Sequence, residues 1–137
     1  MRPGHRTLPH TADLLIEAWA PTRAECLAET VRALAEAVAD VRFARPEGTV
    51  AFRVTGPDDP ALLRDLLEEV VVLVEVEGVV PAAVSVVEDG GALLATLGVV
   101  PLDRVETVGP APKAVTRHQL ALEPRPDGWH SRVLVDV

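Results

Sequence analysis

Residues 13–38 read DLLIEAWAPTRAECLAETVRALAEAV, and the hydrophobic period of this stretch changes once along its length. The first seven residues alternate between two faces, which is typical of a strand with one buried face. The residues predicted to share the buried face are Leu14, Ile16 and Ala18. A strand that leads into a helical pattern indicates a domain containing both kinds of element.

The second part of this stretch predicts a helix that ends near Val38. Thr22 and Glu25 have the spacing of a capping box, in which the threonine oxygen accepts an amide of the first helical turn. Apolar and small side chains then recur at helical spacing and predict one buried stripe. Its members are Cys26, Leu27, Thr30, Val31, Leu34 and Val38.

The next segments repeat the order of strand and helix. Residues 49–55 alternate as a strand does, and a second helix is predicted with Asp59 as its cap and Pro60 at its first helical position. Gly78 fits the position just past the helix. The run VVVLVEV is rich in β-branched residues and also fits a strand, but we favour a helix because the apolar stripe begins upstream.

The second half of the chain predicts four strands. Residues 82–88 and 92–99 flank Asp-Gly-Gly, a hairpin signal. Residues 100–112 contain three prolines and a glycine and are interpreted as an irregular loop. Residues 113–123 and 129–137 are the last two strands. The expected order is β-α-β-α-β-β-β-β, an α+β fold with two helices packed on a mixed or antiparallel sheet.

Composition limits the class of protein. The 137 residues are 48% hydrophobic and 3% aromatic, so we expect one domain, residues 1–137, with an aliphatic core. The net charge of −8 argues against strong direct binding of nucleic acid and favours cations or basic protein surfaces. The single cysteine, the absence of a signal-like apolar run in the first 13 residues and the lack of a membrane-spanning stretch predict a cytoplasmic protein.

The end of the chain places charges together. If Val133 and Val135 are buried, Asp136 faces outward, beside the terminal carboxylate of Val137. Leu120 and Leu122 are the best inward candidates of the preceding strand, and His118 would then also face inward. This register predicts that four residues share the outer face with Asp136: Lys113, Val115, Arg117 and Gln119. Adjacent carboxylates repel unless a positive group lies between them, which could be Lys113, Arg117 or a metal ion.

Four segments, in this order, resemble the archease family: HTADLLIEAWAPTRAE, LLRDLLEEVVVLVEVEG, PKAVTRHQL and DGWHSRVLVDV. The resemblance covers nearly the whole chain. It implies a small cytosolic, non-enzymatic accessory protein of RtcB-type RNA ligases, which act in tRNA splicing and RNA repair. Such a protein promotes guanylylation of the ligase's active-site histidine, allows multiple turnover and can broaden the nucleotides that the ligase accepts.

The resemblance also implies the functional residues. A divalent cation, Ca²⁺ with Mg²⁺ as the alternative, would be bound by Asp13, Asp136 and the terminal carboxylate of Val137. The family's lysine in KAxTYH falls on Lys113, the only lysine of this chain. Lys113, Asp13 and Asp136 are therefore the residues expected to act in ligase activation. This sequence reads KAVTRH, so Arg117 stands where the family has tyrosine.

Two other function classes remain open. One is a general protein-binding chaperone for nucleic-acid-processing enzymes, which the acidic charge permits. The other is a metal-assisted hydrolase that uses Asp13, Asp136 and His10 as a base. The sequence argues against the hydrolase because it contains no nucleophile elbow, zinc-ligand spacing or Gly-rich phosphate loop. In the activator, His10 would be a hydrogen-bonding neighbour of the metal ligands.

Overall fold

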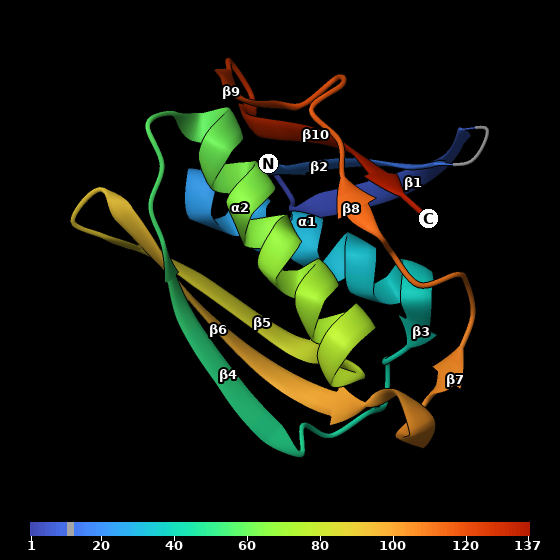
Figure 1. Cartoon of the computed structure of the whole chain (residues 1–137). Coiled ribbons are helices and arrows are strands. Elements are labelled where there is room, and N and C mark those ends of the chain that lie inside the picture. Colours follow the sequence, from blue (N-terminus) through green and yellow to red (C-terminus); the bar gives the residue numbers. More distant parts are fainter. Residues whose placement is uncertain (11–12) are drawn as a thin grey trace.

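The computed structural model describes residues 1–10 and 13–137, and of Pro9 and His10 it describes the backbone alone. In the described part of the chain, two larger antiparallel sheets flank the helices (Figure 1). The first sheet has the order β1-β2-β10-β8, and β9 also pairs with β10. Its strands are β1 (Gly4–His10), β2 (Asp13–Ala20), β8 (Ala114–Val115), β9 (Ala121–Arg125) and β10 (Gly128–Asp136).

The second sheet has the order β4-β6-β5, and a two-stranded ribbon joins β3 to β7. These strands are β3 (Ala39–Asp40), β4 (Gly48–Val54), β5 (Val79–Asp89), β6 (Ala92–Pro101) and β7 (Glu106–Thr107), and a 3₁₀ turn, η2, spans Leu102–Arg104. Every strand pair in the described residues is antiparallel. The predicted α+β class, with two helices on antiparallel sheets, is confirmed.

The helices begin where side chains can cap them. For α1 (Arg23–Val38), the Thr22 hydroxyl accepts the Glu25 amide at 3.2 Å, as the sequence predicts. For α2 (Asp59–Val72), the cap is Asp58, one residue earlier than predicted, because its Oδ1 accepts the Ala61 amide at 2.9 Å.

The structure at the end of the second helix decides between the helix and strand interpretations of VVVLVEV, residues 70–76. After α2 the chain continues as a π-helix, η1 (Leu73–Glu77), and ends at Gly78 with φ 68°. Glycine adopts this left-handed conformation without the steric cost that other residues carry. The helix interpretation of VVVLVEV is therefore confirmed.

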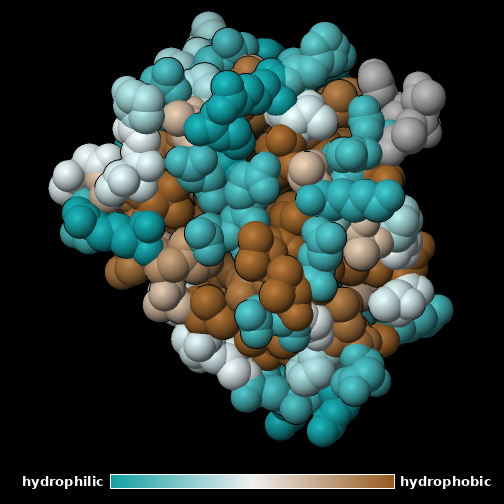
Figure 2. Space-filling view, viewed as in Figure 1, coloured by the Kyte–Doolittle hydropathy of each residue, from teal (hydrophilic) through white to brown (hydrophobic). Residues whose placement is uncertain are grey.

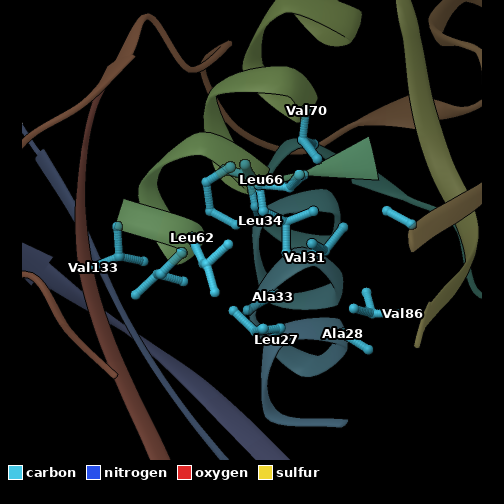
Figure 3. Packing of buried hydrophobic residues seen from close by; sticks show 14 of the residues in the cluster. Leu27, Ala28, Val31, Ala33, Leu34, Leu62, Leu66, Val70, Val86 and Val133 are labelled. Carbon is cyan, nitrogen blue, oxygen red and sulfur yellow. The ribbon is translucent and has the colours of Figure 1, made fainter. Parts of the chain in front are cut away.

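One main core joins both helices to both large sheets (Figure 3). It includes Leu27 and Leu34 of α1, Leu66 of α2, Val133 of β10 and Val86 of β5. Because two helices and two sheets all contribute side chains, a chain with few aromatic residues can form a well-packed core from aliphatic side chains. A smaller cluster lies beside the β3–β7 ribbon and contains Val38, Val74, Val80 and Val100.

A buried polar contact fixes α1 against β10. Thr30 and Ser131 are both buried, and their hydroxyl oxygens lie 2.7 Å apart. The Thr30 hydroxyl also lies 2.8 Å from the carbonyl of Cys26. Both side chains are therefore satisfied inside an apolar environment, where an unmatched hydroxyl is costly.

Strand β1 is absent from the predicted order. It pairs with β2 along its full length, from Gly4 opposite Trp19 to His10 opposite Asp13. Its sequence, GHRTLPH, contains glycine, proline and few apolar residues, so it gives little strand signal. A side chain at Gly4 would force the Trp19 ring to move, because a Cβ there would lie 2.7 Å from it.

The predicted register of residues 113–123 is wrong at its start. Val115 is buried opposite Val135, rather than on the outer face with Asp136. The two strands β8 and β9 are separated by a turn in which Gln119 has φ 60°. This turn breaks the two-residue alternation, so inward Leu122 does not determine which face Val115 occupies. His118, expected inside, lies in the turn and is exposed.

Candidate functional site

The first sheet brings the two predicted aspartates together. In the register of β2 with β10, Asp136 lies directly opposite Asp13. On the neighbouring strands, His10 is opposite Asp13 and Ala114 is opposite Asp136. These four positions form one row across the end of the sheet, and side chains of directly opposite residues share a face.

The row lies on the sheet face that points away from the main core. Ile16, Val133 and Val135 are fully buried in that core, and Asp13 and Asp136 occupy the alternate positions of the same strands. Both aspartates are partly exposed. Two carboxylates thus meet at the surface, where solvent or a partner could reach them.

The end of the chain is held by hydrogen bonds from the β8 segment. The amide of Lys113 donates to the carbonyl of Asp136 at 2.7 Å, and the amide of Thr116 donates to the carbonyl of Leu134 at 2.9 Å. Figure 1 shows the C-terminus between β8 and the end of β1 and β2. The side chain of Val137 packs against the main core, which holds in place the residue whose terminal carboxylate is a predicted ligand.

Lys113 lies beside this row but not in it. The position opposite Asp136 belongs to Ala114, and Lys113 is the exposed residue just before β8. Its ammonium forms no ion pair with any residue that the structure describes. A lysine on a flexible four-carbon stem can turn toward an anionic group of the site or of a partner.

Helix α2 supports the same segment from the core side. Glu68 of α2 accepts the amide of Val115 at 3.1 Å. The amide of a short strand therefore finds a carboxylate partner, and the position of β8 depends on α2. No local pattern in the sequence shows this contact, because Glu68 and Val115 are 47 residues apart.

Other predicted positions do not join the row. Arg117 and His118 lie in the exposed turn between β8 and β9. The side chain of His10 lies outside the described residues, so its predicted role as a neighbour of the ligands stays a prediction. The loop 100–112 contains η2 and β7, and β7 pairs with β3.

The donor set suits a hard cation. The predicted ligands are two side-chain carboxylates and the terminal carboxylate of Val137, and oxygen donors of this kind are those that Ca²⁺ and Mg²⁺ prefer. Within residues 1–10 and 13–137, no group of three or more His, Cys, Asp or Glu side chains is arranged to bind a metal. A cation bound here would need the terminal carboxylate and water, in addition to Asp13 and Asp136.

The single cysteine does not form a second reactive site. Cys26 is buried in α1, and burial raises the pKa of its thiol to about 11. A thiol of this kind is almost fully protonated near neutral pH and is a poor nucleophile. The structural role predicted from its place in the apolar stripe is consistent with this environment.

A large depression on the described surface lies elsewhere. It has a volume of about 420 Å³ and is lined by residues of the β3–β4 loop and of the η2 segment, including Phe43 and Arg104. It is wide open and does not include the aspartate row.

No helix in the described part of the chain has the length and apolar character needed to span a membrane.

Comparison with known proteins identifies the family. The model of the Archease protein family (MTH1598/TM1083) matches residues 5–137. The probable protein archease of Mycobacterium tuberculosis H37Rv is 37% identical over 134 residues, which cover 98% of this chain and 75% of that protein. Protein archease of Methanopyrus kandleri is 29% identical over 135 residues, covering 95% and 96%.

Solved structures share the fold. The solution structure of Methanobacterium thermoautotrophicum protein 1598 has a TM-score of 0.76 at 21% identity, covering 98% of this chain and 99% of the other. The crystal structure of an archease from Thermotoga maritima, described as a possible chaperone, has a TM-score of 0.68 at 20% identity, covering 100% and 98%. The chain therefore belongs to the archease family, whose members are non-enzymatic accessory proteins.

Proposed function

We propose that this protein activates an RtcB-type RNA ligase of tRNA splicing and RNA repair. It promotes guanylylation of the ligase's active-site histidine, so that one ligase molecule completes many cycles. It acts in the cytoplasm as a single domain of residues 1–137. The observation that carries the proposal, together with family membership, is the register that places Asp13 opposite Asp136 at the end of the first sheet.

We assign a divalent cation to Asp13, Asp136 and the terminal carboxylate of Val137. Ca²⁺ is favoured over Mg²⁺ because it accepts irregular geometry and a shell completed by water. Only two side chains contribute, and both are partly exposed, so water or a partner must supply the remaining ligands. A cation bound there supplies positive charge that can bind phosphate oxygens of a nucleotide.

Lys113 supplies a second positive charge next to this row. Its backbone is tied to Asp136, while its exposed ammonium is left available to an anionic oxygen. A compact ammonium suits a single phosphate oxygen, whereas the guanidinium of arginine is a wide planar fork. In this proposal Asp13 and Asp136 hold the cation, and Lys113 binds or orients an anionic group of the ligase complex.

The charge of the chain is consistent with a protein partner rather than RNA. A net charge of −8 repels phosphate backbones. An enzyme that holds RNA carries a basic surface, and an acidic accessory protein is attracted to such a surface. The proposal therefore expects direct contact with the ligase and no strong binding of RNA by this chain alone.

A second candidate function is a general chaperone for nucleic-acid-processing enzymes. The description of the Thermotoga maritima archease as a possible chaperone favours it. A chaperone would protect several unrelated basic proteins, and the aspartate row would not be needed for that protection. An activator acts through one ligase and depends on the row.

One set of assays distinguishes the ligase activator from the general chaperone. Guanylylation and RNA joining are measured with limiting ligase and excess GTP, with and without this protein. Heat-induced aggregation of the ligase and of two unrelated basic proteins is followed in parallel. We expect several joining events per ligase only when the protein is present, and no general protection. General protection with unchanged joining would reject the activator and support the chaperone.

A further inference from the structure

The outward face of α2 and η1 carries apolar side chains that remain exposed. Val72 is 47% exposed and Val76 is 72% exposed, and the two are one helical turn apart. Figure 2, drawn in the view of Figure 1, shows a hydrophobic area over the lower part of this helix. Exposed apolar patches rimmed by polar residues mark sites where proteins interact.

Carboxylates surround these valines. Glu69 precedes Val72 by three residues and Glu75 follows it by three, so both lie next to it on the helix surface. Glu69, Glu75 and Glu77 are exposed and form no ion pair with the residues that the structure describes. Their charges are thus available to a partner.

The sequence around this face has no compensating positive charge. From residue 65 to residue 103 the chain contains no lysine, arginine or histidine. Arg64, just before this segment, is paired with Asp65 at 3.2 Å. Arg53 of β4 lines a depression together with Glu68 and Glu69, so the negative rim of this apolar face is formed mainly by Glu75 and Glu77.

This face is connected to the aspartate row. Glu68 of α2 accepts the amide of Val115 in β8, and β8 pairs with the end of β10, which carries Asp136. Figure 1 shows α2 and β8 side by side. A partner surface that reaches Asp136 and Lys113 can extend onto α2 by passing over the edge strand β8, which lies between them.

We propose that the face of α2 and η1 centred on Val72 and Val76 docks a basic protein surface with an apolar centre, located on the ligase. The identity of this partner rests on the proposed function, while its chemistry follows from charge complementarity. RNA is a poor occupant because its phosphates meet carboxylates. A second copy of the chain in a symmetric pairing would oppose two negative rims.

The test measures the dissociation constant of the ligase for the wild type, Val72→Arg and Val87→Arg. Val87 is a matched control because it is 48% exposed, close to the 47% of Val72, and lies on β5 of the second sheet. Both substitutions add the same charge. We expect Val72→Arg to raise the dissociation constant about tenfold or more, and Val87→Arg to change it less than about twofold.

A second readout separates docking from activation. At a concentration of Val72→Arg that saturates the ligase, the rate of guanylylation should equal that of the wild type. Glu75→Gln should weaken binding by a smaller factor and reduce its dependence on salt, because one charge of the rim is lost. Circular dichroism confirms that each variant is folded.

The outcomes separate this inference from the proposed function. If Val72→Arg binds as tightly as the wild type, or if Val87→Arg weakens binding equally, the docking surface is wrong and activation is unaffected. If the wild type binds without stimulating the ligase, the proposed function is rejected. The dissociation constants of Val72→Arg and Val87→Arg still test the docking surface in that case. If the wild type does not bind the ligase at all, both are rejected.

Discussion

Replacing Asp136 with asparagine should change the stability of the protein in opposite directions with and without a divalent cation. Asp136 lies directly opposite Asp13 in the first sheet. Side chains in such positions have Cβ atoms roughly 5 Å apart, and two like charges at this separation repel by about 1 kcal/mol in water. Without a cation, Asp136→Asn should therefore raise the free energy of unfolding by a few tenths to about 1 kcal/mol.

A bound cation reverses this order. A ligand that binds only the folded protein stabilises it by about 2.7 kcal/mol at a concentration one hundred times its dissociation constant. For a domain of 137 residues this corresponds to an increase in Tm of roughly 10 °C. The variant loses one of two side-chain ligands, so most of this increase should disappear and the wild type should become the more stable protein.

The assay is thermal unfolding followed by circular dichroism, first with EDTA and then with increasing Ca²⁺ or Mg²⁺. Asp103→Asn is the control, because Asp103 is exposed in η2 and the substitution removes the same charge. It should respond to the cation as the wild type does. The reasoning is refuted if Asp136→Asn is less stable than the wild type in EDTA and is stabilised equally by the cation.

Three further predictions concern the fold. Thr30→Val or Ser131→Ala alone should lower the free energy of unfolding by about 1–3 kcal/mol, and the double variant should lose less than the sum, in a urea double-mutant cycle. Because burial raises the pKa of Cys26 to about 11 from its usual 9, the native state holds the thiol proton more tightly. Stability should fall by up to about 2–3 kcal/mol as pH rises from 9 to 11, and Cys26→Ala should remove this slope in urea titrations at each pH. Gly4→Ala should cost about 1–3 kcal/mol because its Cβ would meet the Trp19 ring at 2.7 Å, whereas at Gly48 the nearest atom is 3.6 Å away; equal melting temperatures for Gly4→Ala and Gly48→Ala would contradict this.

The parts of the fold that follow local periodicity are predictable from the sequence. Thr22 caps α1 as its spacing indicates, and Ile16 and Val133 occupy the core as the alternation of their strands requires. These features depend on neighbours within a few residues, and the hydrophobic pattern records them directly.

Features that depend on distant partners were not predictable. Strand β1 has a weak pattern of its own and is held by pairing with β2. The left-handed Gln119 resets the alternation between β8 and β9, and glutamine gives no signal for such a conformation. This single residue explains why Val115 and His118 exchange the environments that continuous alternation assigns to them.

The candidate site was also predictable only in part from local patterns. Alternation along β10 predicted that Asp136 faces away from Val133 and Val135, and this is confirmed. The pairing of Asp136 with Asp13 could not be predicted in this way. It depends on the register between two strands more than a hundred residues apart, and no local pattern contains that information. The resemblance to the archease family supplied that pairing of residues, and their shared role in binding a cation stays a prediction.

The most direct test of the account is the number of RNA joining events per ligase molecule, measured at saturating concentrations of the wild type, Asp136→Asn, Lys113→Ala and Asp103→Asn. The account predicts repeated turnover with the wild type and with Asp103→Asn. It predicts about one event per ligase with Asp136→Asn and with Lys113→Ala, although both still bind the ligase. Repeated turnover with Asp136→Asn would contradict the claim that the aspartate row at the end of the first sheet is the functional site.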